Sequence, residues 1–207
     1  MMKIAPDDLL LVIDVQNDFC PGGALAVAEG DAVVPVVNRL AGRFDHVVLT
    51  QDWHPAGHSS FATSHPGAAP FSEIAMPYGP QTLWPDHCIQ GTAGAAFHPD
   101  LATDRAELVI RKGFRAAIDS YSAFFENDRK TPTGLAGYLR ERGLRRVVMA
   151  GLATDYCVQY SALDARRLGF ETIVVLAGCG AIDLGGSLAI ASAAMREAGV
   201  ELVDELV

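Results

Sequence analysis

Four residues that can take part in acid–base or nucleophilic chemistry each stand just after a short apolar run of the chain. They are Asp14, Asp52, Lys112 and Cys157. If those runs are parallel strands, the residues past their carboxyl ends meet at one edge of the sheet, where open α/β sheets bind ligands. Each residue alone is compatible with a helix cap or a surface ion pair. The four together indicate a functional site.

Cys157 is the candidate nucleophile. It lies near the start of a predicted helix, where Thr154 or Asp155 could act as the N-cap. The positive end of a helix dipole favours the thiolate form of a cysteine. Backbone N–H groups at the same helix start could also hold an oxyanion. The alternative for Cys157 is an inert buried thiol, which is also the role we expect for the remaining cysteines: Cys20, Cys88 and Cys179.

A nucleophilic cysteine needs a base, and histidine is the usual one. All six histidines of this chain lie between positions 46 and 98, in or near an irregular segment. Asp14 and Lys112 are therefore the better partners for Cys157. We expect Asp14 to accept the thiol proton and Lys112 to be the cation that holds both groups in their reactive states.

A second group of residues has the composition of a metal site. Asp52 and His54 are two positions apart, so on an extended chain their side chains share a face. His58 follows at once, and His87 follows about thirty residues later; further oxygens are nearby on Ser60 and Asp86. One carboxylate and two imidazoles suit Zn²⁺, with Mn²⁺ or Fe²⁺ as alternatives, and leave positions open for water or a ligand. Ordinary surface histidines are the competing interpretation.

The elements that position these residues follow from the hydrophobic pattern. Unbroken apolar runs predict strands buried on both faces, as in a parallel sheet; they lie at 9–13, 47–49, 108–110, 147–150 and 172–176. Amphipathic stretches between them predict helices at 32–43, 134–142, 155–168 and 187–198. This alternation is typical of a three-layer α/β/α sandwich with a mostly parallel, doubly wound sheet. A segment rich in proline, histidine and tryptophan, at about 52–99, fits neither pattern and reads as a binding insertion.

Composition limits the classes of protein that remain. The 207 residues carry 16 Lys and Arg against 25 Asp and Glu, a net charge of −9, which disfavours nucleic acid as a partner. No apolar run is long enough to span a bilayer, and no signal peptide is recognisable, so we expect no membrane contact and a cytoplasmic location. The length predicts one domain over 1–207. The sequence leaves a monomer and a homo-oligomer open, and a small-molecule substrate is the expected partner.

Five motifs together resemble a known family, the nicotinamidase/pyrazinamidase branch of the isochorismatase-like cysteine hydrolases. They occur in the family's order and cover nearly the whole chain: Ile13-Asp14-Val15-Gln16-Asn17-Asp18-Phe19, Gln51-Asp52-Trp53-His54-Pro55, Trp84-Pro85-Asp86-His87-Cys88, Arg111-Lys112-Gly113 and Gly151-Leu152-Ala153-Thr154-Asp155-Tyr156-Cys157.

The resemblance implies a six-stranded parallel sheet and a catalytic triad of Asp14, Lys112 and Cys157. It also implies one divalent metal ion held by Asp52, His54 and His87, with Ser60 or His58 as a fourth group, directly or through water. Leu152–Ala153 would be a cis peptide whose region supplies the oxyanion donors, the Ala153 and Cys157 amides. A ring pocket would be lined by Phe19, Trp84 and Tyr121.

The implied activity is metal-dependent hydrolysis of nicotinamide to nicotinate and ammonia through a cysteine thioester, as in NAD salvage, with pyrazinamide also accepted. A sister hydrolase acting on another small amide or carbamoyl group is the nearest alternative. Such an enzyme needs the triad but not the Asp52, His54 and His87 set. A non-catalytic binding module is the other alternative, and the intact triad argues against it.

Overall fold

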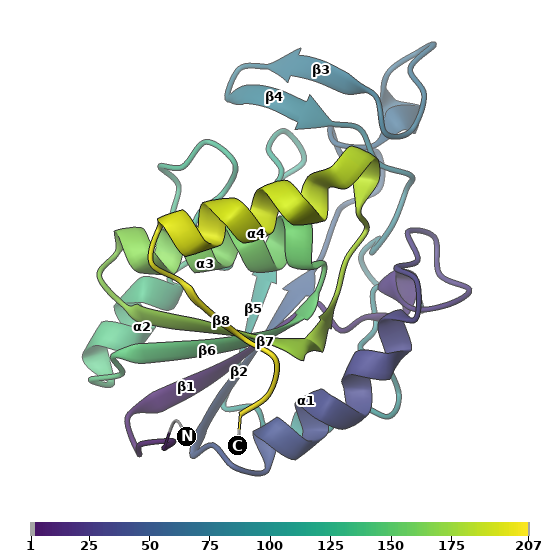
Figure 1. Ribbon diagram of the computed structural model, residues 1–207. Coiled ribbons are helices and arrows are strands. Elements are labelled where there is room, and N and C mark those ends of the chain that lie inside the picture. The colour runs from purple at the N-terminus through teal and green to yellow at the C-terminus, as the bar shows by residue number, and fades with distance from the viewer. Residues whose placement is uncertain (1–2, 207) are drawn as a thin grey trace.

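The computed structural model describes residues 3–206 and contains a six-stranded sheet flanked by helices (Figure 1). The strands of this sheet are β1 (Asp8–Ile13), β2 (His46–Asp52), β5 (Leu108–Lys112), β6 (Arg146–Leu152), β7 (Glu171–Gly180) and β8 (Glu201–Val203). Their order across the sheet is β5-β2-β1-β6-β7-β8, and each neighbouring pair is parallel. The expected doubly wound α/β fold with six strands is confirmed.

The central strands form because both of their faces are covered. Every residue of β1 is buried, and β2 and β6 are buried along all but their first residue. Such strands read as continuous apolar runs rather than alternating ones. β8 has only three residues and lies at the sheet edge, half-exposed, so it gives no comparable signal in the sequence.

The helices occupy both faces of the sheet. They are α1 (Val33–Ala41), α2 (Leu135–Glu141), α3 (Gln159–Arg167) and α4 (Ser187–Glu197). α1 covers one face, and α3 and α4 lie side by side over the other (Figure 1). Within the described part of the chain, no helix has both the length and the apolar character that crossing a membrane requires.

The chain changes direction between β1 and β6. From β1 it proceeds to β2 on one side, and from β6 it proceeds to β7 on the other. A crevice opens at such a switch point, outside the carboxyl ends of the two strands, and ligands bind there in open α/β sheets. Asp14 follows β1 directly, and Cys157 lies five residues after β6.

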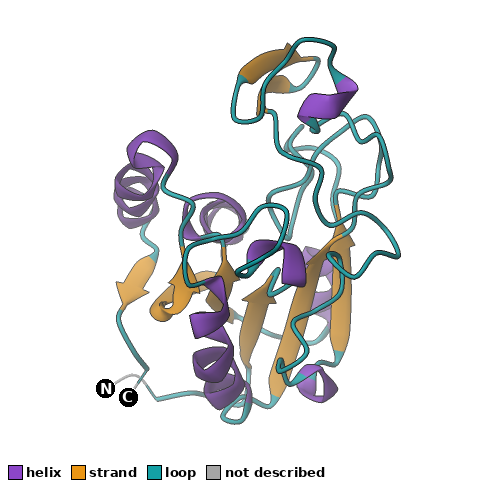
Figure 2. Cartoon of the chain, turned by 90° about the vertical axis from the view of Figure 1, so that its right-hand side faces the viewer, coloured by secondary structure: helices purple, strands orange, loops and turns teal. Residues whose placement is uncertain are grey.

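The long segment between β2 and β5 lies over this same end of the sheet. Figure 2 shows loops gathered where the strand arrows point, with a small separate sheet beyond them. That sheet is an antiparallel hairpin of β3 (Glu73–Met76) and β4 (Gly79–Thr82). The predicted irregular segment thus contains a hairpin that hydrophobic periodicity did not indicate.

Candidate active site

Three of the predicted residues meet because their strands are neighbours. Asp52 and Lys112 are opposite each other in the register of β2 and β5, and Asp14 follows β1 on the other side of β2. The Lys112 ammonium lies 2.7 Å from Asp14 Oδ2 and 2.7 Å from Asp52 Oδ1. It also donates to Cys157 Sγ at 3.4 Å and to the Ser120 carbonyl oxygen at 3.1 Å. One buried cation therefore connects the nucleophile, the base and the first metal-site carboxylate.

Burial governs the ionisation of the triad. It raises the pKa of the Cys157 thiol well above its ordinary value, against the pull of Lys112. It likewise raises the pKa of Asp14, against the same cation. The pKa of Lys112 is also raised well above its ordinary value, because Asp14 and Asp52 outweigh the cost of burying the ammonium. Burial therefore favours the neutral thiol of Cys157 and increases the basicity of the Asp14 carboxylate, and it acts against the preference for the thiolate that the helix-start position gives.

The backbone around Cys157 differs from the predicted N-capped helix. Residues Thr154–Val158 form a π-helical turn before α3, and neither Thr154 nor Asp155 makes a capping hydrogen bond. Thr154 Oγ1 donates to the Gly180 carbonyl oxygen instead, at 3.0 Å. The Asp155 carboxylate instead accepts hydrogen bonds from a neighbouring loop, from the N–H groups of Ile182 and Asp183 and the hydroxyl of Ser187. Cys157 is therefore fixed by the strand–turn junction rather than by a helix cap.

The junction between β6 and this turn requires glycine. Gly151 has a φ of +130°, and a Cβ at this position would lie 2.1 Å from the Ile13 carbonyl oxygen. The next peptide, Leu152–Ala153, is cis, as the family resemblance implies. The Ala153 N–H donates to no backbone acceptor among the described residues, and Ala153 lines a cavity together with Cys157.

The second group of predicted residues also comes together. Asp52 Oδ2 lies 3.3 Å from His54 Nε2 and 3.5 Å from His87 Nε2. Both histidines donate through Nδ1 to backbone carbonyl oxygens, at Gly113 (2.9 Å) and Pro85 (2.8 Å), so their Nε2 atoms are the ones that face the carboxylate. Backbone partners of this kind orient the histidine ligands of metal sites. The donor set fits a divalent transition metal ion.

Electrostatics keep this carboxylate ionised. Burial alone would raise the pKa of Asp52, but Lys112 and His54 hold the pKa well below its usual range. Gly113 provides the close approach that seats His54, because a Cβ there would lie 2.4 Å from His54 Cε1. Gly113 also has a φ of +66°, which favours glycine independently.

The two predicted fourth groups contact each other rather than the Asp52 carboxylate. His58 Nδ1 is 2.7 Å from Ser60 Oγ, and His58 Nε2 is 2.9 Å from the Arg115 carbonyl oxygen. A carboxylate that sequence reasoning missed, Asp119, also lies beside the metal set, with Oδ1 4.0 Å from His54 Nε2, and it forms a second candidate ligand group with His54 and His58. Asp119 is in a loop after β5 and has no motif around it, so only the fold places it here.

A small cavity joins the two groups. The three predicted ring-pocket residues, Phe19, Trp84 and Tyr121, all line it, as do the metal-site and triad residues Asp52, His87 and Cys157. Four lining residues were not predicted: Leu25, Asp119, Tyr156 and Ile182. Trp84 meets Tyr156 edge-to-face with ring centroids 4.8 Å apart. The walls are therefore aromatic, with one polar end and one nucleophile, which suits a small flat ligand.

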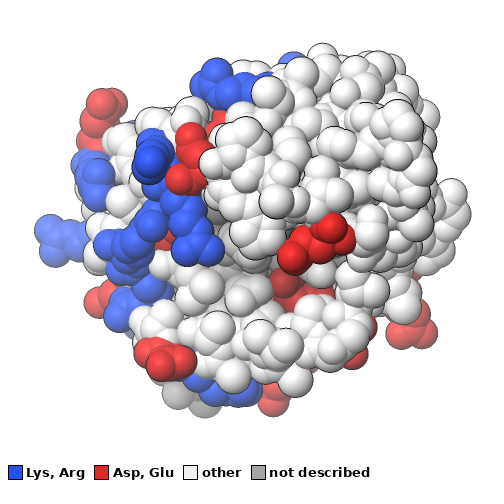
Figure 3. Space-filling view, turned by 90° about the horizontal axis from the view of Figure 1, so that it is seen from above, with Lys and Arg blue, Asp and Glu red and all other residues white. Residues whose placement is uncertain are grey.

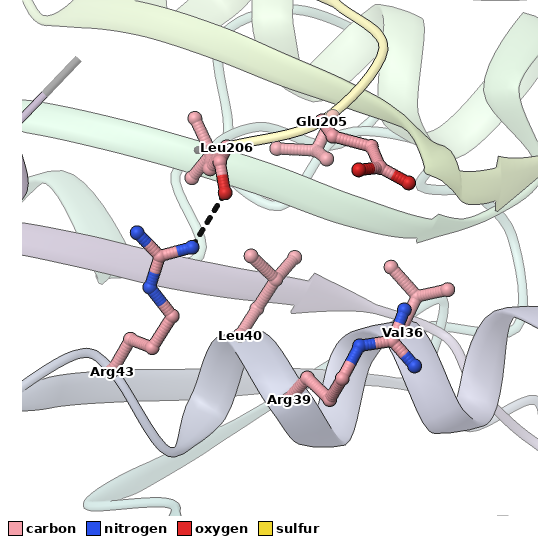
Figure 4. A pocket seen from close by; sticks show the side chains of 7 residues that line it. Val36, Arg39, Leu40, Arg43, Glu205 and Leu206 are labelled. Carbon is pink, nitrogen blue, oxygen red and sulfur yellow. Dashed lines mark hydrogen bonds between the residues drawn. The ribbon is translucent and has the colours of Figure 1, made fainter. Parts of the chain in front are cut away.

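Figures 3 and 4 show two features of the rest of the molecule. Seen from the loop end in Figure 3, Lys and Arg gather to one side, while the residues over much of the remaining face are uncharged. Another cavity lies between α1 and the C-terminal segment, where Arg43 donates to the Leu206 carbonyl oxygen (Figure 4). None of the predicted site residues lines that second cavity.

A doubly wound sheet with Cys, Asp and Lys at its switch point, beside a carboxylate–imidazole set, defines a class of cysteine hydrolases. The sequence model of the Isochorismatase domain matches residues 8–205, and the chain belongs to this family.

Several relatives of this chain are named as nicotinamidases or pyrazinamidases. The nicotinamidase of Acinetobacter baylyi is 53% identical over 202 residues, covering 98% of this chain and 94% of the relative. The solved Acinetobacter baumanii nicotinamidase/pyrazinamidase is 56% identical and superposes with a TM-score of 0.96, covering 97% of each chain. A Pyrococcus horikoshii pyrazinamidase solved in complex with zinc is 35% identical, with a TM-score of 0.79, covering 97% of this chain and all of that one.

Proposed function

We propose that this chain is a nicotinamidase that hydrolyses nicotinamide to nicotinate and ammonia and also accepts pyrazinamide. The contacts of Lys112 carry the proposal, because this one ammonium touches Asp14, Cys157 and the carboxylate of the candidate metal site. Identity of more than half to proteins named as nicotinamidases supports it. The proposal extends to the whole chain as a single hydrolase domain, with residues 52–99 as the metal- and substrate-binding insertion.

The chemistry begins with the thiol. Asp14 takes the Cys157 proton as Sγ attacks the carboxamide carbon, and Lys112 stabilises the charge that develops between them. The tetrahedral oxyanion is held by backbone N–H groups at Ala153 and Cys157. Collapse of this species breaks the C–N bond, and the proton returns from Asp14 to the departing nitrogen, which leaves as ammonia. Attack by water on the thioester then releases nicotinate and restores the thiol.

The metal set has a separate task in this proposal. Asp52, His54 and His87 would hold one divalent ion, with zinc as the first candidate because a zinc complex of a homologue has been solved. When bound, the ion supplies a Lewis-acid position for the ring nitrogen, directly or through water, and so fixes the ring. Trp84 and Phe19 line the cavity that would receive the ring.

Ammonia release from nicotinamide tests this function directly. The wild-type protein should release ammonia and nicotinate in equal amounts, and Cys157→Ala should release neither while unfolding at the same temperature. Benzamide has the amide but lacks the ring nitrogen, so it should be a poor substrate. Equal rates on benzamide and nicotinamide would favour the sister-hydrolase alternative.

A further inference from the structure

The β3–β4 hairpin lies apart from the main sheet, yet it places one fully buried polar side chain against the cavity. Figure 1 shows the hairpin at the carboxyl end of the main strands, beyond α4. Most hairpin residues are half-exposed or exposed, whereas Gln81 on β4 is only 1% exposed. A buried amide needs partners for its two hydrogens and its oxygen, so its contacts show what the hairpin holds.

The nitrogen of this amide faces the polar wall of the cavity. Gln81 Nε2 lies 2.9 Å from Asp119 Oδ2, 2.9 Å from Tyr121 Oη and 2.8 Å from the Thr82 carbonyl oxygen, so its two hydrogens are shared among three acceptors. The carboxylate and the carbonyl can only accept hydrogen bonds, which fixes the nitrogen, rather than the oxygen, on this side. Both Asp119 and Tyr121 line the cavity.

The oxygen of the amide ties the same side chain to its surroundings. Gln81 Oε1 accepts hydrogen bonds from Tyr78 Oη and from Asn127 Nδ2, both at 3.1 Å. Asn127 in turn accepts from the backbone N–H of Tyr121 through Oδ1, at 3.0 Å. Gln81 is thereby joined to the Tyr121 side chain directly and to its backbone through Asn127.

These contacts determine where the Tyr121 hydroxyl hydrogen points. Tyr121 Oη receives a second hydrogen bond, from Trp84 Nε1, at 3.0 Å. An amide nitrogen and an indole nitrogen are donors only, so the phenol hydrogen must point away from both. No residue in the described range accepts a hydrogen bond from Tyr121 Oη, and the ring lines the cavity, so this donor remains available to a ligand there.

The same amide orients the carboxylate beside the metal set. Asp119 Oδ1 accepts from the Ser120 N–H at 2.8 Å and lies 4.0 Å from His54 Nε2. Gln81 holds the other oxygen. With both oxygens assigned, the carboxylate cannot rotate without losing a buried hydrogen bond.

We infer that Gln81 is a positioning residue for substrate binding, acting through the Tyr121 hydroxyl and the Asp119 carboxylate. This inference rests on the proposed nicotinamidase function and deepens it. The hairpin is then part of the binding site, although it contributes no residue that touches the triad. Its effect belongs to substrate affinity rather than to the chemical step, because Gln81 contacts neither Cys157, Asp14 nor Lys112.

The test is steady-state kinetics of Gln81→Met, which keeps the length of the side chain and removes its hydrogen bonds. KM for nicotinamide should rise about tenfold, the effect of about one lost hydrogen bond, with kcat within about threefold of wild type. In a Tyr121→Phe background, where the hydroxyl is absent, Gln81→Met should raise KM by a clearly smaller factor. Glu73→Gln, on the exposed face of the same hairpin, should leave KM unchanged.

Alkylation of Cys157 with iodoacetamide counts the competent sites in each variant. A purely structural role would lower the fraction of alkylatable protein or the unfolding temperature and leave KM unchanged, and that result would overturn the inference. If Gln81→Met raised KM by the same factor in the wild-type and Tyr121→Phe backgrounds, the inference that Gln81 acts through the Tyr121 hydroxyl would also be overturned.

Should Gln81→Met fail to fold, Gln81→Glu replaces it, measured at a pH at which the new acid is ionised, since it then keeps an acceptor for Tyr78 and Asn127 but cannot donate to Asp119. Its KM should rise by at least as much as expected for Gln81→Met, and an unchanged KM would equally contradict the inference. The wild-type protein distinguishes failure of the proposed function from failure of the role assigned to Gln81. A wild-type protein that releases no ammonia refutes the proposed function itself, whereas wild-type turnover with an unaltered KM in the variant refutes only the role of Gln81.

Discussion

Replacing Lys112 with methionine removes the one cation between two buried carboxylates. Asp14 and Asp52 each lie 2.7 Å from the ammonium, and the side chains are 0% and 6% exposed. Methionine has similar length and no charge, so the change isolates the electrostatic contribution. The carboxylates would then face each other in the protein interior without a counter-charge.

The expected loss in the free energy of unfolding follows from removing one partner of a buried ion pair. Removal of one partner typically destabilises a protein by about 3–5 kcal/mol, because the other charge stays buried and unpaired. Two carboxylates share this cation, which places Lys112→Met at the upper end of that range. For a chain of this size the unfolding temperature should fall by roughly 10–20 °C.

The loss should depend on pH with a definite sign. Without Lys112, burial raises the folded-state pKa of Asp14 further above its unfolded value, and Asp52 loses the strongest of the interactions that lower its pKa. Such a group contributes stability below its unfolded pKa and loses that contribution as pH rises through the folded pKa. The stability deficit of Lys112→Met should therefore be smallest near about pH 4 and grow towards neutrality.

Urea unfolding of chelator-treated wild type and variant, at several pH values, measures this deficit. Lys130→Met, at an exposed position, is the control and should be nearly neutral. Adding Asp14→Asn to Lys112→Met should recover part of the loss, since the two changes are coupled. A deficit that is the same at acidic and neutral pH, or strict additivity in the double variant, would refute the electrostatic account.

Three further perturbations address the base and the metal set. Asp14→Asn should lower kcat at least about 100-fold and slow iodoacetamide alkylation of Cys157 without loss of fold. In the wild type, kcat/KM should decline towards acid pH, because the Asp14 carboxylate, whose pKa is raised, then becomes protonated. Chelation or His87→Ala should abolish most nicotinamide turnover yet leave the alkylation rate within about threefold, and a metal-free enzyme with full activity would contradict this. Gly113→Ala should weaken metal binding at least about tenfold in competition with a chelator, because its Cβ would contact the His54 ring.

The strands that are buried on both faces could be predicted from the sequence. β1 and β6 are enclosed on both faces, and their apolar runs marked them within a few residues. The hairpin gave no such signal, because β4 contains Gly79 and Pro80 and its strands pack on one side at most. β8 was likewise too short and too exposed to identify by pattern, and only the family resemblance supplied a sixth strand.

The candidate site, like the fold, could be predicted from the sequence only in part. Residues that directly follow strands could be placed, since the sheet itself brings Asp14, Asp52 and Lys112 together. Asp119 and Gln81 could not, because they approach the cavity from a loop and a hairpin whose positions depend on long-range hydrogen bonds. The pKa of Cys157 could not be judged from sequence for a related reason: burial, which only the fold determines, raises it against the favourable local position.

A covalent intermediate on Cys157 is the most direct evidence for the proposed chemistry. Acid quenching of the enzyme during nicotinamide turnover, followed by mass spectrometry of its peptides, should show a nicotinoyl thioester on the peptide that contains Cys157. The adduct should be absent from Cys157→Ala and should disappear once nicotinamide is exhausted. Full ammonia release with no adduct at any time, or release that persists in Cys157→Ala, would contradict the assignment of this residue as the nucleophile.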